Sequence, residues 1–172
     1  MDGDNVDANR YKTAVAHAQE SGLENVYWLG PELEVQTVVF DSIAGFYPEG
    51  VAGDPVGGVQ LAYFNRENFR GRLEITTLSP SDWARVEDKV RNPPQPPIRS
   101  EKVVIGGREG DLIATIALGR DPNGLKLVID FGDSFVIAQT NVAIAAGGRD
   151  VNPLMDEDTF LAVMEELRPY PE

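Results

Sequence analysis

The chain contains no cysteine, and this absence excludes several kinds of chemistry. Without a thiol it can form no disulfide, no thiolate nucleophile, no Cys-ligated zinc site and no iron–sulfur cluster. Histidine is nearly absent too, because His17 is the only one among 172 residues. A Ser-His-Asp triad would have to use His17, and a zinc site with several histidines cannot form. We therefore expect no catalytic residue, no resident metal and no cofactor.

Sequence motifs for two common kinds of site are also missing. The segment FGDSFV around Ser134 lacks the second glycine of a GxSxG elbow. The glycine cluster GGREG (106–110) matches neither phosphate-binding pattern, and the β-branched segment DLIATIALG that follows it predicts a strand. A phosphate loop must instead open a helix, because the free amides of a helix N-terminus hold the phosphate. We interpret these glycines as a hairpin corner that requires positive φ angles.

Cationic residues are scarce: 15 Lys and Arg stand against 28 Asp and Glu, which gives a formal net charge of −13. Such a surface repels nucleic-acid phosphates and anionic lipid headgroups, so we expect no nucleic-acid partner. No run approaches the roughly 20 apolar residues of a membrane-spanning helix, and no signal segment opens the chain. The polar start MDGDNVDANR is compatible with a removed signal or lipid anchor, and residues 1–5 are expected to be disordered or an artificial extension.

The rest of the composition is that of a folded protein, with 42% hydrophobic residues, 17 Gly and 12 Pro. The length suits one domain over residues 1–172. Helical spacing of apolar residues predicts a first helix over 6–20, and alternation predicts strands within 25–39, 59–79 and 102–142. The order of elements indicates an α+β domain: a twisted antiparallel sheet of about six to eight strands, with N-terminal, middle and C-terminal helices packed on one face.

Two of the expected helices have clear start signals and buried stripes. Ser79 is a typical N-cap before Pro80, and Asp156 is a typical N-cap before an acidic first turn. Pro169 and Pro171 are expected to end the last helix. Apolar residues recur at helical spacing after each cap, and they are Trp83, Val86 and Val90 in the middle helix and Phe160, Val163, Met164 and Leu167 in the last one.

Glycine and proline concentrate between Asp41 and Gly58, where we expect a long loop. Loops of this length are uncommon without a function, so this loop is the first candidate for a recognition surface, and a flexible insertion without a binding role is the alternative. The binding residues expected there are Phe46, Tyr47, Pro48, Val51, Pro55 and Val56. Aromatic pairs could add to a ligand pocket or could fill the core, and they are Tyr27-Trp28, Phe46-Tyr47 and Tyr63-Phe64.

Acidic residues offer two further alternatives. Glu74 and Asp130 lie within expected strands and could face a cleft as a pair of catalytic carboxylates, although a solvent-facing position is the simpler interpretation. Oxygen ligands for calcium occur near the last helix, but their spacing differs from that of an EF-hand, and a helix cap explains them as well. These candidate ligands are Asp150, Asn152, Asp156 and Asp158.

The segment AHAQESGLENVYWLGPEL (16–33), an Ala-rich helix followed by an aromatic strand, resembles the opening of uncharacterised extracytoplasmic domains of bacterial lipoproteins from actinobacteria and related phyla. The closing layout, a β-meander and a helix ending in LRPYPE, is similar to the same kind of domain. The resemblance implies a secreted or membrane-anchored domain without assigned catalytic residues. The chain departs from such lipoproteins in lacking a signal and the cysteine that receives the lipid.

The sequence therefore favours a non-enzymatic extracytoplasmic binding or structural module with an unknown protein partner. An alternative is a carrier that holds an apolar small molecule or a lipid between sheet and helices, which would require an apolar pocket of several hundred Å³. A carboxylate-based hydrolase that uses Glu74 or Asp130 is a more remote alternative.

Overall fold

The computed structural model describes residues 12–13, 15–16, 18–20, 22–30, 35–40, 58–63, 71–92, 97–115, 124–142 and 156–170. Residues 12–13, 15–16 and 18–20 are helical, which agrees with the expected first helix. The strands are β1 (Val26–Trp28), β2 (Val35–Phe40), β3 (Val59–Tyr63), β4 (Gly71–Leu78), β5 (Arg99–Ile105), β6 (Arg108–Thr115), β7 (Gly124–Asp130), β8 (Phe135–Val142) and β9 (Arg168–Tyr170). The further helices are α2 (Pro80–Arg91) and α3 (Glu157–Met164).

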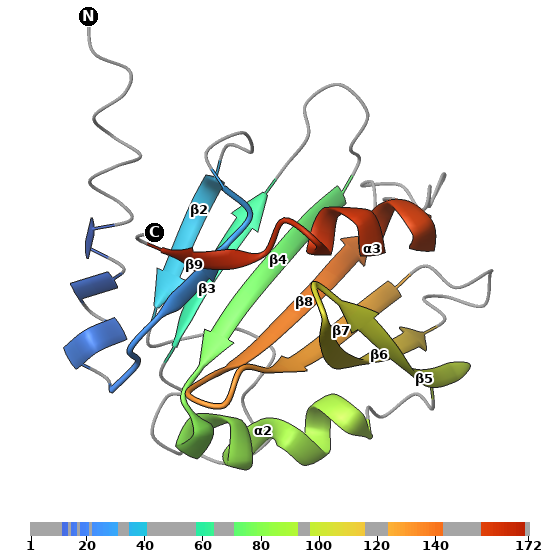
Figure 1. Ribbon diagram of the computed structural model, residues 1–172, viewed down its shortest axis with the longest axis horizontal. Helices are drawn as coiled ribbons and strands as arrows, with labels where there is room; N and C mark the ends of the chain where they lie inside the picture. Colours follow the sequence, from blue (N-terminus) through green and yellow to red (C-terminus); the bar gives the residue numbers. More distant parts are fainter. Residues whose placement is uncertain are drawn as a thin grey trace, which may run out of the picture.

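Seven of these strands form one antiparallel sheet in the order β2-β3-β4-β8-β7-β6-β5 (Figure 1). It consists of two meanders, β2-β3-β4 and β5-β6-β7-β8, which meet where β4 pairs with β8. The α2 helix connects β4, at the centre of the sheet, to β5 at its edge. The α+β class and the antiparallel sheet expected from the sequence are therefore confirmed.

The sheet is buried on both faces, because neighbouring residues in its central strands point to opposite sides. We call one side the α2 face, since Leu78, Val128 and Ile137 pack there with α2. We call the other side the α3 face, since Leu127 and Ile129 of β7 pack there with α3. The expectation that all helices share one face was wrong. The apolar run in β7 could not show this, because a strand buried on both faces loses the alternation of polar and apolar residues.

The α2 helix begins and packs as its sequence predicts. The Ser79 hydroxyl accepts a hydrogen bond from the Asp82 amide at 3.2 Å, and Pro80 occupies the first turn. Trp83, Val86 and Val90 are buried against the sheet. Because these three apolar side chains all lie on one side of the helix, α2 packs as a layer on the α2 face of the sheet (Figure 1).

The α3 face is covered by α3 and by a second, two-stranded sheet of β1 and β9. The Asp156 carboxylate accepts a hydrogen bond from the Thr159 amide at 2.8 Å, which confirms the expected cap. Phe160 and Met164 are buried in the core. The chain after α3 does not simply stop at its prolines: Pro169 lies in β9 opposite Tyr27, because the two-stranded sheet tolerates a residue without an amide donor.

The glycine cluster forms the hairpin corner that the sequence predicts. Gly106 and Gly107 connect β5 to β6 with φ angles of 55° and 77°. Two successive positive φ angles define the type I′ turn, which matches the twist of the flanking strands. Ile105 and Arg108 are paired directly at the turn. The phosphate-loop alternative is excluded, since a strand and not a helix follows the glycines.

Several sequence-based expectations lie outside the described residues. These are His17, the expected binding residues Phe46, Tyr47, Pro48, Val51, Pro55 and Val56, the aromatic Phe64, and two calcium candidates, Asp150 and Asn152. In the described part of the chain, no helix has both the length and the apolar composition needed to cross a membrane.

Candidate functional site

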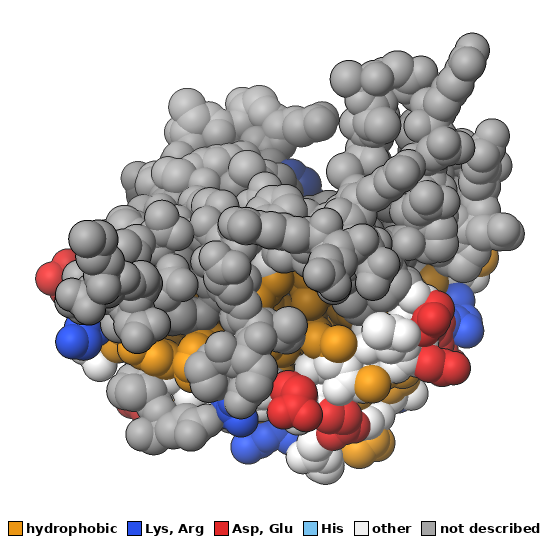
Figure 2. Space-filling view, turned by 90° about the horizontal axis from the view of Figure 1, so that it is seen from above, with side chains coloured by type: hydrophobic (Ala, Val, Ile, Leu, Met, Phe, Trp, Pro, Cys, Tyr) orange, Lys and Arg blue, Asp and Glu red, His pale blue; other side chains and the backbone are white. Residues whose placement is uncertain are grey.

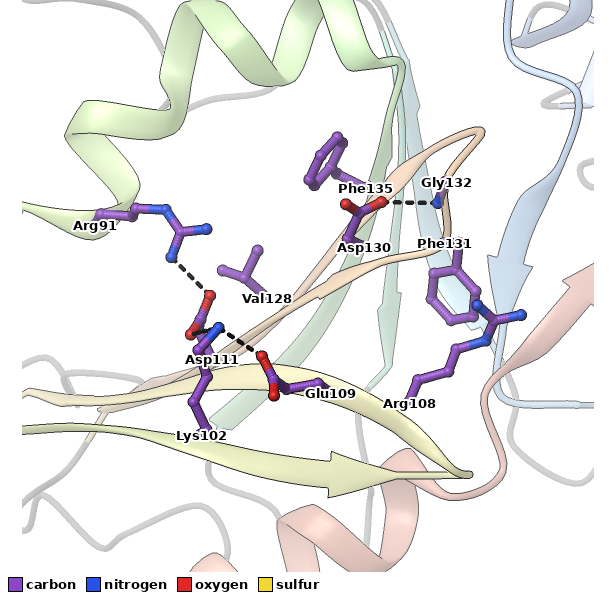
Figure 3. Close-up of a pocket in the computed structure, with 10 residues that line it drawn as sticks. All are labelled: Arg91, Lys102, Arg108, Glu109, Asp111, Val128, Asp130, Phe131, Gly132 and Phe135. Carbon is purple, nitrogen blue, oxygen red and sulfur yellow. Dashed lines mark hydrogen bonds and ion pairs between the residues drawn. The ribbon is translucent and has the colours of Figure 1, made fainter.

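A cavity of about 570 Å³ opens on the α2 face, between the end of α2 and the β5–β6 corner of the sheet (Figure 3). Its volume would suit a small organic molecule. Charged side chains surround an apolar base. The cavity is lined by Arg91, Lys102, Arg108, Glu109, Asp111, Val128, Asp130, Phe131, Gly132 and Phe135.

The register of the sheet explains why these side chains meet. Lys102 pairs with Asp111, and Asp111 pairs with Val128, so one row of neighbouring residues crosses β5, β6 and β7 on the α2 face. The β6–β7 register ends at the pair of Gly110 and Ile129. Glu109 and Asp130 are the next residues of their strands, and both line the cavity on the α2 face. The cavity thus lies where charged rows at the sheet edge meet the apolar centre.

The base of the cavity belongs to the core beneath α2. Phe135 stacks on the buried ring of Trp83, with a centroid distance of 4.9 Å and an angle of 13° between the rings. The guanidinium of Arg91 lies 5.5 Å from the centroid of the Trp83 ring. Packing of α2 therefore fixes both the aromatic base and one cationic wall of the cavity.

One wall is a network of ion pairs centred on Asp111. Its carboxylate accepts a hydrogen bond from Arg91 at 2.7 Å and one from Lys102 at 2.8 Å, one on each oxygen. The Lys102 ammonium nitrogen also lies 3.0 Å from a carboxylate oxygen of Glu109, and Nε of Arg91 lies 2.8 Å from a carboxylate oxygen of Glu87. Figure 3 shows the two cations converging on Asp111 from α2 and from β5. The network ties the edge of the sheet to the last turn of α2.

The pKa values in this wall follow from these contacts. Burial alone would raise the pKa of Asp111, but the hydrogen bonds from Lys102 and Arg91 together hold it below its ordinary value. The pKa of Lys102 is raised, first by its hydrogen bond to Asp111 and then by the one to Glu109. The pKa of Arg91 is raised as well, first by its hydrogen bond to Asp111, so Asp111, Arg91 and Lys102 are all charged at neutral pH.

Replacing Asp111 by asparagine is expected to lower the free energy of unfolding by about 1–2 kcal/mol at pH 7, because Arg91 and Lys102 lose their shared anion. A depressed carboxyl pKa stabilises the fold above the unfolded-state value of about 3.9, and this contribution is lost as the pH falls through the folded-state pKa. Urea unfolding of both proteins should show a difference that shrinks below about pH 4. The exposed control Asp158→Asn should change little, and an equal Asp111→Asn effect at neutral and acid pH would contradict the prediction.

The opposite side of the cavity contains two further charged residues, Asp130 and Arg108. One oxygen of Asp130 accepts a hydrogen bond from the Gly132 amide at 2.7 Å, which shapes the turn after β7. The guanidinium of Arg108 lies 4.8 Å from the centroid of the Phe131 ring. In the ranges that the structure describes, neither Asp130 nor Arg108 has an oppositely charged partner.

Of the two acids considered from the sequence, only Asp130 lines the cavity. Glu74 lies on the same face but is buried elsewhere, where it accepts a hydrogen bond from Gln139 at 2.6 Å. Glu74 of β4 pairs with Gln139 of β8, and Gln139 pairs with Lys126 of β7. Asp130 lies four residues after Lys126 in β7, so the two acids are two strands and four residues apart. Standard strand spacings put the two acids on the order of 15 Å apart, too far to act as a pair of glycosidase carboxylates.

The other candidate residues that the structure describes cap a helix, lie exposed on one or pack in the core, and none of them lines the cavity. Asp156 caps α3 and Asp158 is exposed in its first turn. Tyr27 and Trp28 are buried in the core, where Tyr27 stacks on Phe131 with a centroid distance of 3.9 Å. Within the described residues, no cluster of three or more His, Cys, Asp or Glu side chains could hold a metal ion.

Sequence reasoning missed most of the cavity. Arg91, Lys102 and Asp111 come from three separate elements, and each alone resembles an ordinary surface charge. A usable signal was present in the alternation of β6, where Glu109 and Asp111 fall on one side of the strand and Gly110, Leu112 and Ala114 are buried on the other. That pattern predicts a row of charged side chains on one side of β6, but it does not predict that α2 packs beside this row and closes one side of the cavity.

The face of the molecule that Figure 2 shows has charged side chains of both signs. Figure 2 shows described Asp and Glu side chains lying among Lys and Arg side chains at the rim of the visible face. Comparison of the chain with protein-family models, curated proteins and solved structures finds no match. The cavity geometry is therefore what supports a proposal about function.

Proposed function

We propose that this protein is a non-enzymatic binding module whose cavity takes a small zwitterion, a molecule with an ammonium group and a carboxylate such as a free amino acid. The observation that carries this proposal is the pair of Asp130 and Arg108. Both line the cavity, and neither has an oppositely charged partner among the described residues. A zwitterion supplies one partner for each.

The neighbouring groups fit the two ends of such a ligand. Glu109 and Asp130 both line the cavity, and Glu109 uses one oxygen to bind Lys102, so both acids can offer a carboxylate oxygen to an ammonium group. Arg108 offers a planar guanidinium to the ligand carboxylate. Val128 and Phe135 provide an apolar base for an aliphatic part.

Other ligand classes fit less well. A purely apolar molecule would leave the charged lining desolvated without partners, which is costly. A simple anion would meet three lining carboxylates in a chain of net charge −13. An amine without a carboxylate would leave Arg108 unpaired. The extracytoplasmic location stays a prediction that rests on the N-terminal resemblance.

The test is an NMR titration of the isotopically labelled protein with three matched probes: norvaline, butylamine and pentanoate. The last two each lack one charged group of norvaline. We expect norvaline to shift the amide resonances of residues 108–111 and 128–132. Each single-charge probe should bind at least about tenfold more weakly, since a charged hydrogen bond is worth about 1.5–3 kcal/mol.

Two variants connect binding to the proposed groups. Asp130→Asn and Arg108→Met should each weaken norvaline binding by about tenfold or more, whereas the distant Asp158→Asn should leave it unchanged. The proposal is wrong if norvaline does not bind, or if butylamine or pentanoate binds as tightly as norvaline.

A further inference from the structure

The β5 strand is one edge of the seven-stranded sheet, and it shows few of the features that normally protect an edge from pairing. It has seven residues, contains no proline, and runs along β6 without a shift in register from Arg99 to Ile105. An irregularity occurs just before the strand, where the Ile98 amide donates a hydrogen bond to the Ala114 carbonyl. Five of its first six residues are exposed. The exposed large hydrophobic side chains of the described chain, Ile98 and Val104, also lie at the two ends of this strand, with 49% and 69% of their surface exposed.

Charged residues are the usual protection of an edge, but those of β5 are bound to their own chain. Lys102 is bonded to Asp111 and Glu109, which lie on the inner side towards β6. Arg99 is bonded to Glu101 at 3.2 Å and to Glu157 at the start of α3. Neither cation is therefore free to keep a neighbouring strand away.

The hydrogen-bond pattern of the hairpin identifies which backbone groups of β5 are open. Ile105 and Arg108 close a two-residue turn, so their N–H and C=O groups bond to each other. Alternation along an antiparallel pair then directs residues 103, 101 and 99 towards β6 as well. Ser100, Lys102 and Val104 direct their N–H and C=O groups outwards, where a further strand can bind them.

From these observations we infer that two copies of the chain pair through β5, antiparallel and edge to edge, with Glu101 of one copy opposite Glu101 of the other. A two-fold axis perpendicular to the sheet relates such copies, so residues that face each other must come from the same sheet face. This arrangement continues the seven-stranded sheet of one copy into that of the other. It rests on β5 alone and is independent of the proposed ligand.

The apolar residues select this register. With Glu101 on the axis, the Ile98 side chain lies near Val104 of the partner copy, and Val104 lies near the partner's Ile98. The contact is between side chains only, because the Ile98 amide donates a hydrogen bond to the Ala114 carbonyl of β6 at 2.9 Å. Both exposed side chains are thereby covered, and the same contact occurs once on each side of the axis. Ser100 lies opposite the partner's Lys102, and their outward backbone groups form a hydrogen-bonded pair. A shift that places Lys102 on the axis would instead leave Ile98 uncovered.

Charge and space at the axis are compatible with this pairing. The facing Glu101 carboxylates are each already bound by Arg99 of their own chain, and each lies diagonal to the partner's Arg99. The side chains of Arg99 and Glu101 are 47% and 44% exposed, so α3 leaves the edge open on its face. Lys102 lines the cavity, and the partner's Ser100 would lie beside it at the cavity rim.

Because the chain has no cysteine, single-cysteine variants give a direct test. A non-hydrogen-bonded antiparallel pair has Cα atoms about 4.5 Å apart, which suits a disulfide. Under mild oxidation, Glu101→Cys is expected to form a covalent dimer at least about tenfold faster than Ser100→Cys or Lys102→Cys, which report the neighbouring registers. Val104→Cys is the control for random collision, since its position is more exposed than that of Glu101.

A second measurement uses the chain without cysteine. Sedimentation of the unmodified protein should show a monomer–dimer equilibrium, and Val104→Lys should weaken it by about tenfold or more, because both apolar contacts are lost. The thermal unfolding midpoint of Val104→Lys should match that of the unmodified protein at concentrations where both are monomeric. A monomer at all concentrations, equal cross-linking at all four positions, or preferred cross-linking at Ser100 or Lys102 would overturn the inference.

Discussion

Replacing Trp83 by alanine is expected to lower the free energy of unfolding by about 3–5 kcal/mol, the usual cost of removing a large aromatic ring from a core. Trp83 keeps only 4% of its surface exposed, and it is the largest side chain that α2 places against the sheet. Its ring stacks on Phe135, so the alanine variant also leaves a void below the cavity. Urea unfolding followed by circular dichroism measures the change.

A second variant distinguishes the contribution of aromatic stacking on Phe135 from that of the volume of the Trp83 side chain. Trp83→Phe retains an aromatic ring against Phe135, so it should lose less than half as much stability as Trp83→Ala. The alanine variant should also weaken norvaline binding, because Phe135 and Arg91 both contact Trp83 and line the cavity. A stability loss below about 1 kcal/mol for Trp83→Ala would show that α2 does not depend on this contact.

Replacing Phe160 by alanine is expected to have an effect of similar size, about 3–5 kcal/mol. Phe160 is fully buried, and α3 has only eight residues, so Phe160 and Met164 are the buried residues by which it is attached to the sheet. A helix this short is not stable without tertiary contacts. Loss of the ring should therefore loosen the whole of α3, which hydrogen exchange of the amides in 160–166 can measure alongside urea unfolding.

The neighbouring Val163 provides the control. It is only partly buried against the same core, so Val163→Ala should cost about 1 kcal/mol and leave exchange in α3 slow. Equal losses for Phe160→Ala and Val163→Ala would contradict the packing of α3 through Phe160.

The elements that the sequence predicted well are those whose signals are local. Ser79, Pro80 and Trp83 lie within five residues of one another, and together they determine where α2 begins and which side it buries. The Gly106–Gly107 corner is equally local, because the required φ angles belong to the glycines themselves. The four strands from Arg99 to Val142 pair as the meander that the sequence suggested.

The features that the sequence did not predict depend on partners far along the chain. Nothing near Tyr27 indicates that it pairs with Pro169, and two prolines near the end of the chain looked like terminators. The cavity is a similar case: Asp130 was a candidate because an acid in a strand is conspicuous, but its neighbours come from the register of three strands and the placement of α2. Register and placement follow from the packing of the whole domain.

The pairing of β1 with β9 brings a strand close to the start of the chain together with one close to its end. Contacts between distant segments close the longest loops and carry the largest entropic cost, so this pair is expected to form late in folding, after the local hairpins and the β4–β8 pairing. Because of this pairing, the stability of β1 depends on the presence of β9. The Trp28 ring packs against the Tyr170 ring with a centroid distance of 4.9 Å, so removal of β9 would expose the Trp28 side chain. A truncation or substitution in β9 would therefore disturb the core around β1.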